Sequence, residues 1–120
     1  MIQTQKFPRR WNKITCINFL QRKIIINAIL YYELNTSPLS DKEYDELSRQ
    51  LVEMQKDIDI KNNTQYGYIM YDFDGTTGFD LYSRLNEHDK KYLISIARMA
   101  TNYITPKISS LKKKRKGGLF

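Results

Sequence analysis

Residues 11–35, WNKITCINFLQRKIIINAILYYELN, are the stretch that decides the fold. Their apolar side chains recur at every third or fourth position, which places them on one side of an α-helix. A second apolar row beside the first widens this face, so the predicted helix is well buried. The first row contains Ile14, Ile17, Leu20, Ile24, Ala28 and Tyr31, and the second contains Ile25, Ile29 and Tyr32.

A second helix is predicted directly after the first. Residues 35–40, NTSPLS, stop the first helix because Pro38 disfavours helical geometry in the residue before it. Residues 40–43, SDKE, then have the pattern of a capping box, with a hydroxyl at the cap and Glu43 three residues later. Apolar residues at helical spacing continue to about Lys56. The short connection makes the two helices antiparallel neighbours.

The rest of the chain predicts shorter elements. Residues 57–65 are polar and indicate a loop, and the aromatic residues 66–71 indicate a short extended segment near 66–72 that lies on the helices. Residues 72–78 indicate a turn in which Gly75 and Gly78 have positive φ. A short helix over 79–85 and a longer one over 87–104, closed by Pro106, follow. The fold class is therefore mainly α, a small single-domain bundle of three to four helices.

Charge divides the 120 residues into three parts. Residues 1–23 carry six positive charges and no acid, and residues 105–120 carry six more, whereas residues 24–104 contain eight bases and thirteen acids. We therefore expect a basic N-terminal arm over 1–10, a helical domain over 11–105 and a basic flexible tail over 106–120. A protein that coats nucleic acid with its whole surface is excluded, since the acidic body repels phosphate.

The single cysteine, Cys16, and the single histidine, His88, restrict the chemistry of the protein. One cysteine forms no intramolecular disulfide, and one of each residue provides no structural zinc site, so we expect no metal and a reducing, cytoplasmic compartment. The longest apolar stretch, residues 24–32, is much shorter than the roughly 20 residues that cross a bilayer. The N-terminus shows no secretion signal. The sequence therefore predicts no membrane association.

Residues 31–47, YYELNTSPLSDKEYDEL, resemble the small N-terminal helical domain, domain Ia, of NAD-dependent DNA ligases. In that family a tyrosine closes one helix and a Ser/Pro-Asp-x-Glu-Tyr-Asp sequence opens the next. The resemblance covers residues 24–58 and implies that Tyr31, Asp41, Tyr44 and Asp45 contact the nicotinamide mononucleotide half of NAD. Tyr32 stands where the family usually has a histidine, and we include it as the fifth predicted ligand-binding residue. The resemblance thus implies NAD or nicotinamide mononucleotide as a ligand, while no cofactor is required.

The residue types suit that ligand. A tyrosine ring stacks on a planar pyridinium, and two carboxylates offset its positive charge and bond ribose hydroxyls. Asp41 and Asp45 are four residues apart and share a helix face, beside Tyr44. The alternative is structural: Tyr31 and Tyr44 join the two helices as half-buried aromatics, and Asp41 stabilises the helix N-terminus.

Ligation itself is not expected. The ligase reaction needs a lysine nucleophile in Lys-x-Asp-Gly, and the similar string here, residues 72–75 (DFDG), begins with Asp72. The same string with Thr76 resembles motif I of haloacid-dehalogenase-type phosphatases, but about 45 residues are too few for the rest of that fold. We therefore expect that the protein is not an enzyme, and we predict no catalytic residues. The short, Lys/Ile/Asn/Tyr-rich chain suggests a phage or mobile-element protein.

Two further functions compete with nucleotide binding. The acidic face of the second helix, with Glu43, Glu46 and Glu53 as partner-binding residues, predicts contact with a host nucleic-acid or defence enzyme. The basic termini predict non-specific nucleic-acid binding, above all through the cation run at the C-terminus, which consists of Lys112, Lys113, Lys114, Arg115 and Lys116. The oligomeric state is not predicted.

Overall fold

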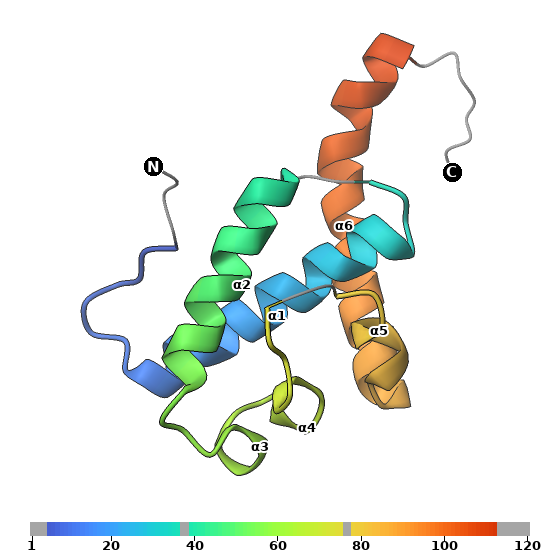
Figure 1. Ribbon diagram of the computed structural model, residues 1–120. Helices are drawn as coiled ribbons and strands as arrows, with labels where there is room; N and C mark the ends of the chain where they lie inside the picture. Colours follow the sequence, from blue (N-terminus) through green and yellow to red (C-terminus); the bar gives the residue numbers. More distant parts are fainter. Residues whose placement is uncertain (1–4, 37–38, 76–77, 113–120) are drawn as a thin grey trace.

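The computed structural model describes residues 5–36, 39–75 and 78–112, with side chains as far as Thr101 (Figure 1). Within these residues the chain is helical and contains no strand, which confirms the mainly α fold class. Three helices are long and three are single turns, so the described chain has more helices than the three or four predicted. The helices are α1 (Lys13–Tyr32), α2 (Asp41–Gln55), α3 (Ile60–Asn63), α4 (Gly67–Met70), α5 (Leu81–Arg84) and α6 (Glu87–Lys112).

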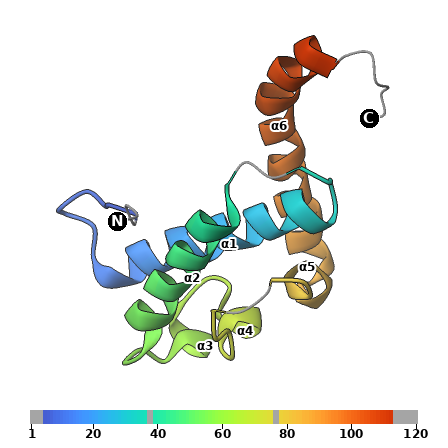
Figure 2. The same cartoon turned by 45° about the horizontal axis from the view of Figure 1, so that its top comes forward.

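Helix α1 is the centre of the fold. Asn12 caps its first turn by accepting a hydrogen bond from the Thr15 backbone N–H (2.9 Å). Helix α2 packs along α1, with Gln55 beside Gln21 and Tyr44 near Tyr32, and α6 crosses α1 towards its C-terminal end (Figures 1 and 2). The two predicted apolar rows are therefore covered along most of their length, but Tyr31 and Tyr32 at their C-terminal ends remain exposed. The fully buried side chains of α1 include Ile17, Leu20, Ile24, Ile25 and Ile29.

In the connection between α1 and α2, the start of α2 forms as predicted, whereas α1 ends by a different turn from the predicted one. Ser40 and Glu43 make the capping box, with bonds of 3.1 and 2.9 Å to each other's backbone N–H. Helix α1 ends because Asn35 adopts a left-handed conformation (φ 53°) and the Thr36 N–H donates to the Leu30 carbonyl (2.8 Å). Pro38, the predicted stop, lies outside the described residues.

The segment 57–72 corrects two predictions. The expected loop over 57–65 contains α3, whose first turn Asp59 caps, and the expected extended segment near 66–72 is wrong because it contains α4. No strand among the described residues is available to pair with it. Helical geometry instead directs Tyr66, Ile69 and Met70 into the core, where all three are buried. Tertiary burial thus overrides the local β preference of the aromatic residues.

The structure confirms the predicted conformation of Gly75 but not that of Gly78. Gly75 has the predicted positive φ (88°), whereas Gly78 does not, so that prediction is wrong. A side chain at Gly78 would lie 2.3 Å from the Tyr44 hydroxyl, so close packing is what requires glycine there.

The prediction that Pro106 closes the last helix is also wrong, since α6 continues to Lys112. A proline removes one backbone donor, and the following turn keeps its helical form.

A buried polar network joins α1 to α2 and to the segment that contains α3 and α4. The Gln21 side chain donates to Gln55 Oε1 (2.9 Å) and to Thr64 Oγ1 (3.0 Å), and it accepts from the Tyr66 backbone N–H (3.1 Å). Gln21 is completely buried. The network therefore bonds the middle of α1 to α2 and to the segment that contains α3 and α4.

Candidate functional site

The C-terminal end of α1 carries an exposed aromatic group, formed by Tyr31, Tyr32 and Phe79. The rings of Tyr31 and Tyr32 are almost perpendicular (89°), with centroids 4.8 Å apart, and Phe79 packs edge-on against Tyr32 at 5.5 Å. The exposed fractions are 49% for Tyr31, 40% for Tyr32 and 68% for Phe79. So much exposed aromatic area in one place is uncommon on a small folded chain, and it is typical of a binding surface.

An open hollow lies beside two of these rings. Tyr31 and Tyr32 line it together with Asn35 and Thr36, and it has a volume of about 400 Å³. The left-handed turn at Asn35 is what brings its amide side chain next to the end of the helix. The hollow therefore offers two ring faces, an amide and a hydroxyl, which is the chemistry that a flat ring with polar substituents requires.

Tyr44 of α2 lies beside this group but points inward. Its ring is half-buried, and its buried hydroxyl has no hydrogen-bond partner among the described residues. Burial, followed by the proximity of Tyr32 and Asp45, raises the pKa of Tyr44 to about 12, although the neighbouring Ser48 hydroxyl opposes the shift. Tyr44 is therefore buried between the helices, and its hydroxyl does not line the hollow.

The two acids predicted to bind the ligand, Asp41 and Asp45, lie in different surroundings on α2. Asp41 and Asp45 are both exposed on α2, and neither lines the hollow. Asp45 is near enough to Tyr44 to influence its ionisation, and so is Tyr32, which brings these three residues into one neighbourhood. Of the five predicted ligand-binding residues, the structure therefore gathers Tyr31, Tyr32, Tyr44 and Asp45, and leaves Asp41 at the start of α2.

The acidic face of α2 is partly neutralised by the chain itself. Glu43 accepts from the Ser40 N–H in the capping box. Glu46 pairs with Arg49 (3.1 Å), and Glu53 pairs with Lys56 (3.0 Å). Pairs this exposed are weak, but each of the three predicted partner-binding acids already has a counter-charge or a donor.

The cation run at the C-terminus is described only at its first residue. Lys112 ends α6, and the other four predicted nucleic-acid residues, Lys113, Lys114, Arg115 and Lys116, lie outside the described residues.

The turn after α4 is held by its own ion pair. The Asp72 carboxylate contacts the Arg84 guanidinium (3.0 Å), and the Tyr71 ring lies between Lys61 (4.7 Å) and Arg84 (5.6 Å). Among the described residues no group of three or more His, Cys, Asp or Glu side chains is arranged to hold a metal ion. Asp72 therefore has a structural contact here, which the sequence pattern did not indicate.

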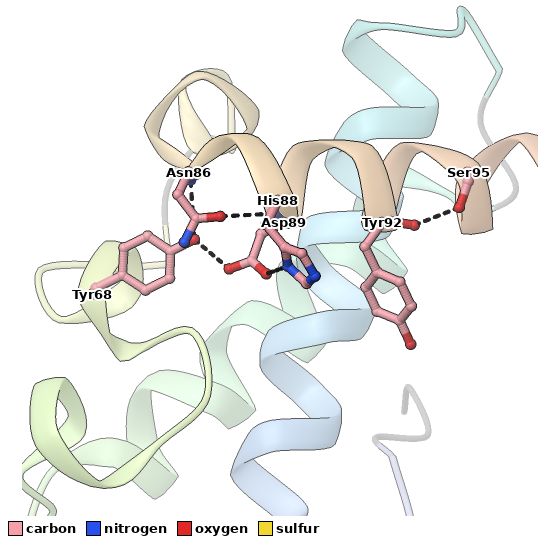
Figure 3. A network of polar contacts seen from close by, with 6 residues as sticks. All are labelled: Tyr68, Asn86, His88, Asp89, Tyr92 and Ser95. Carbon is pink, nitrogen blue, oxygen red and sulfur yellow. Dashed lines mark hydrogen bonds and ion pairs between the residues drawn. The ribbon is translucent and has the colours of Figure 1, made fainter.

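A second polar group, also missed by the sequence reasoning, fixes the start of α6 (Figure 3). The Tyr68 hydroxyl donates to Asp89 (2.5 Å) and accepts from the Asn86 backbone N–H (3.2 Å), while the exposed His88 ring contacts the other Asp89 oxygen (3.2 Å). Burial and the bond to Asp89 raise the pKa of Tyr68 to about 12. Through these contacts the group joins α4 to the start of α6. The contacts join residues 18 to 21 positions apart, which no local spacing reveals.

Comparison of the chain with protein-family models, with curated proteins and with solved structures finds no match. Through the described part of the chain, no helix combines the length and the apolar composition that a bilayer-spanning segment needs.

Proposed function

We propose that this protein is a non-catalytic, DNA-ligase-related domain that binds nicotinamide mononucleotide, alone or as part of NAD, in the hollow beside Tyr31 and Tyr32. The observation that carries the proposal is the pair of exposed, perpendicular tyrosine rings that line an open hollow together with Asn35 and Thr36. A pyridinium ring is flat and positively charged, so it gains from contact with the electron-rich face of a tyrosine. The carboxamide of the ligand can bond to the Asn35 amide or the Thr36 hydroxyl.

The charge of the neighbourhood supports a cationic ring. Asp45 follows Tyr44 on α2 and is exposed, and besides burial it is one of the two neighbours, with Tyr32, that raise the pKa of Tyr44. No lysine or arginine lines the hollow, so nothing among its described lining residues repels a cation. The intramolecular pairs of Glu46 and Glu53 make the competing acidic-face interaction the weaker hypothesis.

The absence of catalysis is part of the proposal. Adenylate transfer in the resembled ligases needs an amine nucleophile, and the comparable string begins with Asp72, whose carboxylate pairs with Arg84. Nucleotide binding would then serve recognition or regulation.

Calorimetric titration with nicotinamide mononucleotide tests the proposal. Tyr31→Ala should weaken binding about fivefold, which corresponds to the roughly 1 kcal/mol of an exposed cation–π contact. The matched control is Tyr92→Ala, which removes an exposed tyrosine (44%) from α6. It should leave the affinity unchanged.

The reduced form of the ligand separates charge recognition from shape recognition. Reduced nicotinamide mononucleotide has an uncharged ring, and we expect it to bind several times more weakly than the oxidised form. Equal binding of the two forms would contradict the cation–ring contact. No heat with either form at millimolar concentration would overturn the proposed function.

A further inference from the structure

The opposite end of α1 carries a second aromatic group, and its surroundings are cationic. Phe7, Trp11 and Phe19 form a triangle with ring centroids 5.8 to 6.0 Å apart. Trp11 remains 37% exposed, whereas Phe7 and Phe19 are half-buried behind it. Lys23 lies over the Phe19 ring at 5.8 Å. We call residues 6–13 with Phe19 and Lys23 the N-terminal surface.

The arm that carries Trp11 is held in place by specific bonds. The Gln5 backbone N–H and carbonyl pair with the Gln50 side chain of α2 (2.9 Å each), and Lys23 donates to Gln5 Oε1 (2.7 Å). The Trp11 N–H closes a turn onto the Pro8 carbonyl (3.1 Å). The arm therefore lies beside α2 and leads into α1 in a fixed conformation (Figures 1 and 2).

The turn presents positive charge without a counter-charge. Arg9 and Arg10 form its tip and are exposed, as are Lys6 and Lys13 on either side. Residues 1–23 contain no acid, and none of the ion pairs between described residues uses one of these four cations. Because the body over residues 24–104 has more acids than bases, anion attraction outside the C-terminal residues 105–120 is concentrated at this end.

We propose that the N-terminal surface binds single-stranded nucleic acid, with Arg9, Arg10 and the flanking lysines on the phosphates and the exposed Trp11 ring stacked on a base. Proteins that bind single strands without reading their sequence combine a cationic track with aromatic stacking platforms, and both are present here. A base within a duplex is already stacked on its neighbours and offers Trp11 no free face. The proposal does not depend on nucleotide binding at the other end of α1.

Trp11 is the only tryptophan of the chain, so its fluorescence reports directly on the proposed contact. The full-length protein is titrated with a twelve-nucleotide oligo(dT) at 50 and 200 mM salt. We expect saturable quenching of Trp11 and an affinity that falls with salt. Four phosphate contacts predict a log–log slope of about −3, from about 0.7 per contact for single strands.

Two variants of equal charge separate a local contact from general attraction. Arg9→Gln with Arg10→Gln should weaken binding about tenfold and reduce the salt slope by about 1.4. Lys91→Gln with Arg98→Gln removes the same charge from exposed positions on α6 and should change neither quantity by as much. Neutralising residues 112–116 tests the predicted tail contact and should leave the quenching of Trp11 in place.

Replacement of the ring tests stacking. With a labelled oligonucleotide and anisotropy as the readout, Trp11→Leu should lose about tenfold in affinity at an unchanged melting temperature, and Trp11→Phe should restore part of it. Oligonucleotide binding without quenching of Trp11, or duplex DNA bound as tightly as oligo(dT), would overturn the proposal. Quenching by anionic lipid vesicles but not by oligo(dT) would overturn it in favour of a membrane surface.

Discussion

The two ends of α1 carry the same kind of aromatic group in opposite electrostatic surroundings. At the N-terminal end the exposed ring of Trp11 lies among arginines and lysines that have no acidic partner. At the C-terminal end the exposed rings of Tyr31 and Tyr32 lie beside the Asn35 amide and the Thr36 hydroxyl, and no lysine or arginine lines the hollow that they share. The two proposals therefore share exposed aromatic rings and differ in the neighbouring charge: we propose an anionic strand as the ligand of the first end and a cationic ring as the ligand of the second.

The largest effect is expected from a change that loosens the body between the two ends. A side chain at Gly67 would lie 1.9 Å from the Ile60 carbonyl oxygen, so Gly67→Ala forces α3 and α4 apart. We expect the free energy of unfolding to fall by about 2–3 kcal/mol. Urea titration followed by Trp11 fluorescence and by far-UV circular dichroism checks this. Lys91→Ala, an exposed control on α6, should change it by less than about 0.5 kcal/mol.

The two urea transitions report on different parts of the molecule. If both ends belong to one cooperative body, fluorescence at the N-terminal end and circular dichroism of all helices give the same midpoint. Separate midpoints would show that the arm and the body unfold independently, and the account of a fixed N-terminal surface would fail.

The next largest effect concerns the independence of the two surfaces. Trp11→Leu should weaken oligo(dT) binding about tenfold and leave nicotinamide mononucleotide unaffected, because the aromatic groups lie at opposite ends of a helix of 20 residues. Tyr31→Ala should do the reverse, with a loss of about fivefold for the nucleotide. The four affinities are measured on the same preparations. A variant that weakens both ligands by similar factors would indicate a shared site.

A smaller effect is expected at alkaline pH. The pKa values of Tyr44 and Tyr68 are raised to about 12, from an ordinary value of 10. Below pH 10 both tyrosines are protonated in the folded and unfolded chains, so their contribution is fully present. Above pH 10 the unfolded chain loses these protons first, and stability falls until the folded pKa is passed. Thermal melts from pH 9 to 12 check this, and Tyr68→Phe should make the fall shallower. A melting temperature that is constant to pH 12 would contradict both shifts.

The smallest effect is expected for Tyr44→Phe. The change removes a buried hydroxyl without a hydrogen-bond partner and keeps the ring, so stability should be unchanged or higher by less than about 1 kcal/mol. Because this hydroxyl faces Gly78 rather than the hollow, binding of nicotinamide mononucleotide should stay within twofold of the unmodified protein. A marked loss of affinity would show that Tyr44 donates to the ligand, as the ligase resemblance by itself implies.

Local patterns in the sequence predicted the parts of the fold that depend on local physics. Helix α1 and the capping box at Ser40 require only residues close in sequence, and both are confirmed, although Tyr31 and Tyr32 of the predicted apolar rows are exposed. The helical turn at Gly67 was missed, because it depends on burial of Tyr66 against distant helices. Gln21 gave no signal, since its three partners lie 34 to 45 positions away.

The candidate site was predicted only where residues close in sequence form it. The resemblance identified Tyr31 and Tyr32, which line the hollow, but the inward direction of Tyr44 follows from the close approach of Gly78, a contact between distant segments. Phe79 was not recognised because only the folded chain brings it onto Tyr32. The triangle around Trp11 likewise requires the arm to fold back, which Gln50 of α2 arranges.

Nitrogen-15 NMR of the unmodified protein, titrated separately with nicotinamide mononucleotide and with oligo(dT), tests the opposite specificity of the two ends most directly. The nucleotide should shift the backbone amides of residues 31–36 and leave residues 6–19 in place. The oligonucleotide should shift residues 6–19, including the Trp11 indole, and leave residues 31–36 in place. Shifts of the same residues by both ligands, or of neither region by either ligand, would contradict the account.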